Sequence, residues 1–301
     1  MLETKISTDF LNLFYHEIKD FEVPGCSSKI NLFTLRIENN QFTYHQLVKN
    51  LTHCIVPFCL SNKELEEFKN NYGIFVIAVE KLRDYESNDG ELGEILLFCL
   101  LESHLRAPKI MTKMELKTST NDYVKGSDGV HLLKIDEQNY QLIFGESKLN
   151  GDYQKGLYQA FKSINDFITR KNNNINHEIG LINTHLQRES VSEEMYKFLK
   201  RIIIPSAADE ELNKDNAFGI FVGFDLKLDP TMVKLPNSDF RRKVRQQIKE
   251  TVEKEINYIE KKINDYNLFG YTFYVYTIPF INLDETRKRV IKNLKVANND
   301  F

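Results

Sequence analysis

The sequence predicts an α/β fold in which helices cover both faces of a mixed sheet. The apolar runs at 130–133 and 140–144 are separated by the polar stretch 136–139, a pattern typical of a β-hairpin. Both faces of this hairpin carry apolar side chains, and such a strand pair normally lies between helices. The neighbouring segments complete the order α-β-β-β-α, with a helix at 91–104, a strand at 109–117 and a second helix at 152–170.

The helix expected at 91–104 follows the polar stretch 87–90, which supplies helix-start signals. Its interior, 95–101, is apolar around the whole circumference and predicts a buried helix. Glu94 continues one apolar stripe, so its carboxylate has to point into the fold or into a cleft, where burial without a partner is costly. Glu91 lies one turn earlier. It is the alternative inward acid, or else a first-turn glutamate that the helix dipole favours.

Three charged residues are expected to meet at one end of the hairpin. With the turn centred near Glu137, antiparallel pairing places Asp128 opposite Glu146. Side chains alternate along a strand, so Glu146 and Lys148 share one face. Two facing carboxylates repel each other unless a cation joins them, and Mg²⁺ usually takes one or two carboxylates together with waters and phosphate oxygens. A nearby lysine could orient the attacking water and offset the charge that develops on the phosphate.

The Glu-x-Lys triplet by itself carries little information. The sequence holds six such triplets, which begin at Glu3, Glu17, Glu67, Glu115, Glu146 and Glu260. A surface ion pair at the end of an ordinary hairpin is therefore the competing interpretation. The inward glutamate of the preceding helix favours the metal site.

Taken together, these segments resemble the PD-(D/E)xK nuclease superfamily and, within it, the HamA family of nuclease subunits from the Hachiman antiphage defence system. The residues that carry the resemblance are 90–94, 126–131 and 145–148, with Ser127 in place of the proline that usually precedes the aspartate. The resemblance implies a restriction-endonuclease-like core with additions on both sides. The implied division is an N-terminal accessory region at 1–84, the nuclease core at 85–170 and a C-terminal extension at 171–301 that completes the fold.

The resemblance also implies a function. Asp128 and Glu146 would bind Mg²⁺ or Mn²⁺, Lys148 would act on the attacking water, and Glu94 would complete the metal or water network. The implied reaction is hydrolysis of DNA phosphodiester bonds, together with a helicase subunit like HamB. The sequence contains no Gly-x-x-x-x-Gly-Lys loop, which fits a subunit that relies on another protein for ATP-driven motion. Two alternatives are a restriction-type endonuclease that cuts alone and a non-catalytic adaptor that binds DNA or a protein.

Two further segments carry candidate nucleic-acid contacts. The helix at 152–170 contains Gln154 and Tyr158, a Gln-x-x-x-Tyr pattern found in some RecB-like nucleases, although core packing is the simpler role for Tyr158. Lys155 on this helix could meet phosphate. A long helix expected at 238–267 carries glutamates that favour a solvated face, and it opens with the basic residues Arg241, Arg242, Lys243 and Arg245.

The remaining segments extend the fold on both sides of the hairpin. We expect strands at 30–37, 73–79, 219–228 and 271–281, a helical stretch at 47–59 that is broken at Pro57, a loop at 171–174 and a final helix at 284–296.

Composition predicts a cytoplasmic protein that does not enter a membrane. No apolar run reaches the length of a membrane span, and the N-terminus lacks the apolar stretch of a signal peptide. The 40 basic and 43 acidic residues give a formal charge of −3, so any DNA contact needs a local basic patch. His131 lies on the opposite strand face from Asp128 and is expected to be structural. The cysteines lack metal-site spacing and predict free thiols, at Cys26, Cys54, Cys59 and Cys99.

Overall fold

A computed structural model describes residues 2–83, 86, 90–114, 126–170, 175–204 and 212–296. Its strands are β1 (Phe14–Glu22), β2 (Ser28–Leu35), β3 (Ile37–Glu38), β4 (Gln41–Phe42), β5 (Lys109–Thr112), β6 (Gly129–Lys134), β7 (Asn139–Asn150), β8 (Asn213–Asp225) and β9 (Thr272–Phe280). Its α-helices are α1 (Tyr44–Cys59), α2 (Asn62–Glu67), α3 (Ile74–Glu80), α4 (Glu91–Ser103), α5 (Tyr153–Thr169), α6 (Ile175–Glu189), α7 (Glu193–Ile203), α8 (Asn237–Glu253), α9 (Ile256–Asp265) and α10 (Leu283–Val296). Two short 3₁₀ helices, η1 (Thr8–Leu13) and η2 (Pro230–Lys234), are also present.

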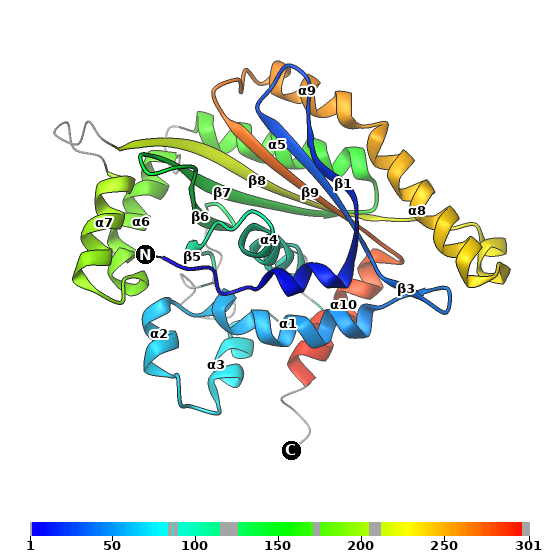
Figure 1. The fold of residues 1–301 in the computed structure, drawn as a ribbon, viewed down its shortest axis with the longest axis horizontal. Helices are drawn as coiled ribbons and strands as arrows, with labels where there is room; N and C mark the ends of the chain where they lie inside the picture. Colours follow the sequence, from blue (N-terminus) through cyan, green and yellow to red (C-terminus); the bar gives the residue numbers. More distant parts are fainter. Residues whose placement is uncertain are drawn as a thin grey trace.

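The centre of the molecule is a seven-stranded mixed sheet in the order β1-β2-β9-β8-β7-β6-β5 (Figure 1). The four central strands, from β2 to β7, run parallel to one another, and the two edges are antiparallel hairpin-like pairs. The parallel strands are buried on both faces, as their nearly continuous apolar sequences require. The predicted α/β fold with a mixed sheet flanked by helices is confirmed.

Helices α4 and α5 cover opposite faces of this sheet. Side chains alternate along a strand, so consecutive residues of β7 contact α5 on one face and α4 on the other. The ring of Phe144 packs on Phe167 of α5 at a centroid distance of 5.6 Å. The next residue, Gly145, faces the other way, and a Cβ atom there would lie 3.1 Å from Leu97 of α4. The central strands are therefore enclosed, and the end of β7 is held between two helices.

The predicted core elements are present with small shifts in their ends. The helix expected at 91–104 is α4, the helix expected at 152–170 is α5, and the strands expected at 219–228 and 271–281 are β8 and β9. The strand expected at 30–37 is β2, followed by the short β3, and the final helix is α10. The four cysteines are free thiols, as predicted. Residues 87–89 of the helix-start signal and the loop at 171–174 lie outside the described residues.

Four predictions about secondary structure are wrong in detail. The apolar run at 73–79 forms helix α3 and not a strand, because it packs against α1 as a short helix that buries Ala78 and Val79. The helix at 47–59 is not broken at Pro57, since this proline lies in the last turn of α1. The long helix expected at 238–267 is two helices, α8 and α9, separated at 254–255. The strand expected at 109–117 ends at Thr112 and turns at 113–114, with 115–117 outside the described residues.

The large sheet takes strands from all three regions of the chain distinguished above. The first region contributes β1 and β2, the core contributes β5 to β7, and the last region contributes β8 and β9. The division at 84 and 170 stays a prediction. Among the described residues, no helix is long and apolar enough to cross a lipid bilayer.

Candidate active site

The site is built on the hairpin of β6 and β7, whose register is the one the sequence predicts. Val130 pairs with Phe144 and Leu132 with Leu142. The turn is fixed by Asp136, whose carboxylate accepts hydrogen bonds from the backbone N–H groups of Gln138 and Asn139. Two residues before the first of these pairs, the Asp128 N–H donates to the Gly145 carbonyl at 2.9 Å. This bond holds Asp128 beside the Glu-x-Lys triplet.

Asp128 is held on both of its carboxylate oxygens. Its Oδ2 accepts hydrogen bonds from the N–H and the hydroxyl of Ser147, at 2.7 and 2.8 Å. Its Oδ1 lies 3.1 Å from the ammonium nitrogen of Lys113. Ser147 is thus more than a spacer in the Glu-Ser-Lys triplet, because it fixes the carboxylate of the opposite strand.

Glu146 and Lys148 lie on the α5 side of β7 and form an ion pair of 2.5 Å. Burial raises the pKa of Glu146, and the neighbouring Asp128 carboxylate raises it further. Burial alone would lower the pKa of Lys148, but the Glu146 carboxylate outweighs this effect and raises it. The two carboxylates therefore repel each other in a partly desolvated site, as the hairpin geometry predicts.

The structure separates the two helix acids. Glu91 is buried, accepts a hydrogen bond of 3.0 Å from the backbone N–H of Arg83 and lies 3.8 Å from the Arg83 guanidinium. Glu94 instead lines a small internal void of about 10 Å³ together with Asp128 and Gly145. Of the two alternatives, it is Glu94 that the fold brings to the hairpin.

Lys113 is a site residue that the sequence reasoning missed. It follows β5, and the pairing of Thr112 with Gly129 places it directly opposite Asp128. Burial alone would lower the pKa of Lys113, but the carboxylates of Asp128, Glu94 and Glu146, in decreasing order of effect, raise it above its ordinary value. The ammonium therefore lies in the field of all three acids. Knowing how β5 pairs with β6 would have revealed it, but that register is not readable from the sequence.

A cavity of about 440 Å³ lies between the hairpin and α5. Its charged lining residues are Asp128, Glu146, Lys113, Lys148 and Arg170. The apolar part of the lining comes from β7, β8 and α5, and it consists of Phe144, Phe218, Ile164 and Phe167. Three cationic groups beside two carboxylates suit a ligand that is itself an anion and brings a metal ion with it.

The carboxylate oxygens of this site suit a hard divalent cation, because the same carboxylates already attract the ammonium of Lys113. Within the described ranges, no three Asp, Glu, His or Cys side chains are already grouped as a set of metal ligands. Mg²⁺ does not require such a set, because it usually takes one or two carboxylates and keeps waters or phosphate oxygens. The pKa of Lys113 is raised by three carboxylates, so their combined charge stabilises a cation at this point of the site. Asp128 and Glu146, with Glu94 beside them, are the side chains that could hold one.

Two neighbouring residues have different surroundings. His131 is buried, its Nδ1 lies 2.8 Å from the Ala107 carbonyl, and burial lowers its pKa to about 4. Its ring lies 5.9 Å from that of Phe98 in α4, and it lines the small void shared by Glu94 and Asp128 but not the larger cavity. This burial is in keeping with a structural role. Tyr158 was expected in the core, and this is wrong, because 41% of its surface is exposed. Its ring instead lies 5.6 Å from the ammonium of Lys262 of α9, so the stripe of α5 that enters the core is displaced from it.

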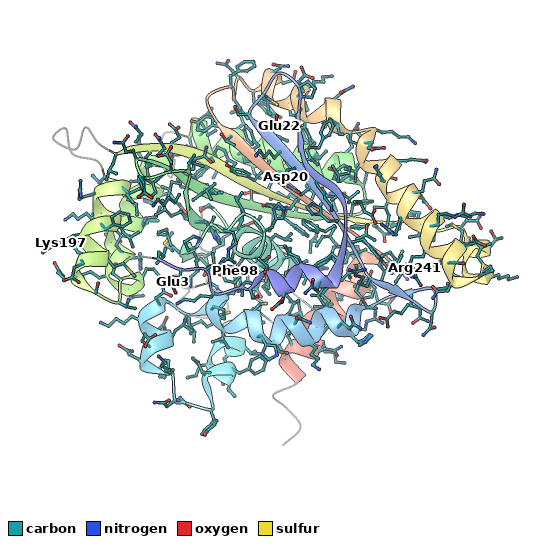
Figure 2. All side chains as sticks on the ribbon, viewed as in Figure 1. Glu3, Asp20, Glu22, Phe98, Lys197 and Arg241 are labelled. Atoms are coloured by element: carbon teal, nitrogen blue, oxygen red, sulfur yellow. The ribbon has the colours of Figure 1, made fainter. Side chains whose placement is uncertain are left out.

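The basic residues proposed for DNA contact lie apart from the cavity. Lys155 is exposed near the start of α5 and is absent from the cavity lining within the described chain. Arg241 lies at one end of the long axis of the molecule, opposite the end occupied by Lys197 of α7 (Figure 2). Within this cluster, Arg242 pairs with Asp239 at 2.9 Å, and Arg245 forms two hydrogen bonds with Glu17, at 2.6 and 3.0 Å. Arg241, Lys243 and the rest of the cluster stay a prediction as DNA contacts.

A model of the HamA family matches residues 8–294, a range that spans the sheet from β1 through β9 and includes the whole site. Among curated proteins, none matches the chain.

Proposed function

The chain belongs to the HamA family and is a component of Hachiman antiphage defence, and from this premise we propose that it is a metal-dependent DNA nuclease. The observation that carries the proposal is the convergence of Asp128, Glu146 and Lys148 on one cavity, where Lys113 also pairs with Asp128. Carboxylates that repel each other in a desolvated cleft are costly to keep, and binding a cation there offsets that cost.

The proposed reaction is hydrolysis of a phosphodiester bond. Bound Mg²⁺ or Mn²⁺ would polarise the phosphate and lower the pKa of a bound water. Asp128 and Glu146 would hold the cation, and Glu94 would add negative charge from the α4 side. Lys148 lies beside Glu146 and orients the water, whose oxygen forms the new bond to phosphorus. The bond from phosphorus to the leaving oxygen of the sugar breaks, and that oxygen takes up a proton, which balances the proton that the attacking water gives up.

The cationic groups of the cavity bind the substrate. Lys113 and Arg170 line the same cavity as the carboxylates, so their positive charges face a phosphate that enters it. Charge that builds on the phosphate oxygens is stabilised by these groups and by Lys148. The formal net charge of −3 gives the chain no general attraction for DNA, so the attraction has to come from local cationic groups.

Membership of the family and this weak overall attraction support a helicase partner. A subunit like HamB would deliver DNA to the cavity, while this chain hydrolyses it. A restriction-type enzyme that needs no partner is the simplest alternative, and a non-catalytic adaptor is the other.

The test compares wild type with Glu146→Ala and with Glu146→Ala/Lys148→Ala on supercoiled and linear DNA. Each protein is assayed with Mg²⁺ or EDTA, and with and without the helicase subunit. We expect metal-dependent cutting by wild type that both variants lose, and a marked stimulation by the helicase. Equal cutting with and without the helicase would identify a self-sufficient endonuclease. An absence of cutting by wild type, with phage protection retained by the double variant, would leave the adaptor.

A further inference from the structure

The backbone just before Asp128 is held by a carboxylate from another helix. Glu178 in the first turn of α6 accepts two hydrogen bonds on Oε1, from the Ser127 hydroxyl at 2.7 Å and from the Ser127 N–H at 3.2 Å. Both residues are buried. The peptide of Asp128 is thus anchored on its N-terminal side, while its own N–H is anchored on Gly145.

Gly126 makes this close approach possible. Its φ of +143° lies in a region that side-chain-bearing residues rarely adopt. A Cβ atom there would lie 2.6 Å from Glu178 Oε2. The glycine therefore serves both the turn of the chain and the contact with the carboxylate.

Burial of the Glu178 carboxylate costs desolvation energy, so its presence at this position needs an explanation. Desolvation raises its pKa, and the two bonds from Ser127 lower it again only in part. The N-terminus of α6 gives some compensation, because the helix dipole favours negative charge in the first turn. A hydrophobic side chain could have filled the same space without this cost.

We infer that Glu178 is a positioning residue, which fixes through Ser127 the orientation of the Asp128 carboxylate for metal binding. This inference rests on the proposed function. It also accounts for Ser127 at the position where the superfamily pattern has proline. Proline stiffens a backbone through its ring but has neither an N–H nor a hydroxyl to donate. Serine supplies both donors, and its two hydrogen bonds to the Glu178 carboxylate of α6 restrain the backbone in place of the proline ring.

Helix α6 itself offers the comparison that separates positioning from simple support. Glu189 is a second buried acid on the same helix, and it accepts a bond of 3.3 Å from the Asn62 N–H at the start of α2. Removing it disturbs the packing of α6 at a place remote from Asp128. Residues that orient metal ligands typically change metal affinity or activity 10- to 100-fold when removed.

The experiment measures Mn²⁺ affinity by calorimetry, well below the unfolding temperature, for the full chain and its variants. Glu178→Ala should weaken Mn²⁺ binding at least tenfold, and Glu178→Gln should restore most of it, because an amide oxygen still accepts both bonds. Glu189→Ala should lower thermal stability and leave Mn²⁺ affinity unchanged. In DNA cleavage with saturating Mn²⁺, Glu178→Ala should recover much of the wild-type rate if its defect is in metal binding.

The outcomes distinguish failure of this inference from failure of the proposed function. Wild-type protein that binds no Mn²⁺ would refute the proposed function, and the positioning role with it. Wild-type binding that Glu178→Ala matches, or that Glu189→Ala loses equally, would refute the positioning role alone. If Glu178→Ala does not fold, Ser127→Ala decides, since it keeps the N–H donor and loses one bond. Its affinity should fall about threefold or more, and an unchanged affinity would overturn the inference.

Discussion

Replacing Lys113 by methionine should tighten binding of a divalent cation to this site. The Lys113 ammonium lies 3.1 Å from Asp128 Oδ1, and both side chains are largely shielded from water, with 17% and 11% of their surface exposed. A cation that binds Asp128 has to displace or share this contact. Methionine has nearly the same length and no charge, so it removes the competitor and preserves much of the packing.

The size of the effect follows from the contact that is lost. A hydrogen bond to a charged group contributes about 1.5–3 kcal/mol net. Since 1.4 kcal/mol corresponds to a factor of ten in an equilibrium constant, we expect Mn²⁺ to bind at least about tenfold more tightly to Lys113→Met than to wild type. Without metal the variant should be less stable, because the Asp128 carboxylate loses its countercharge. Saturating Mn²⁺ should reverse that difference, because it binds the folded state alone.

The assay is calorimetric titration with Mn²⁺, paired with thermal unfolding at rising Mn²⁺ concentration. Lys69→Met is the matched control, because Lys69 forms an exposed ion pair of 3.5 Å with Glu66. Lys69→Met should change neither the Mn²⁺ affinity nor the way the unfolding temperature rises with Mn²⁺ concentration. An affinity of Lys113→Met equal to or weaker than that of wild type would refute the reasoning, since Lys113 would then not occupy a position that the cation needs.

Two further predictions concern stability. Gly156→Ala should destabilise the protein by up to about 2 kcal/mol in urea unfolding. A Cβ atom there would lie 2.6 Å from Val222 Cγ1, and the overpacking cost of about 1–3 kcal/mol is offset by a helix-propensity gain of about 1 kcal/mol. Gly180→Ala, on an open face of α6, should instead stabilise it by about 0.5–1 kcal/mol, and destabilisation by both would contradict the steric argument. Because burial lowers the pKa of His131 to about 4, the unfolded state binds more protons than the folded state between about pH 6.5 and 4, and stability should fall as pH falls through that window. From pH 7.5 to 5 this one group should cost about 2 kcal/mol; His131→Asn should reduce the pH dependence by that amount, and an unchanged slope would show that His131 is not responsible.

The hairpin could be predicted from the sequence because its information is local. Parity fixes which residues face each other once the turn is located, and the turn is signalled by the polar stretch around Asp136. The same holds for α4, where continuation of an apolar stripe favours Glu94 as the inward acid. Periodicity left Glu91 open as the alternative, since the two glutamates lie on one side of the first turn. The contact of Glu91 with Arg83 decides their positions, and that contact depends on a segment outside the helix.

The errors arise where tertiary contacts choose between local options. The apolar run at 73–79 is too short for periodicity to separate a strand from a helix, and packing against α1 selects the helix. The charged stretch around 254–255 gives no glycine or proline to mark the break between α8 and α9. Tyr158 fits the apolar stripe of α5 by spacing, but it lies at the edge of that stripe beside Lys262. In each case the sequence pattern permits the observed structure without requiring it.

The residues that the sequence did not reveal all act on Asp128. Lys113 contacts it from the turn after β5, Ser147 from the neighbouring strand, and Glu178 through Ser127 from α6. Glu146 is paired with Lys148 of its own strand, and Lys148 keeps 29% of its side-chain surface exposed. Removing the Asp128 carboxylate would therefore leave the more deeply buried Lys113 without its nearest countercharge, which is strongly destabilising, and would disturb stability and chemistry together. Removing Glu146 leaves a lysine that can still reach water. For this reason Glu146 is the cleaner probe of catalysis, and Asp128 is the point at which the rest of the fold acts on the site.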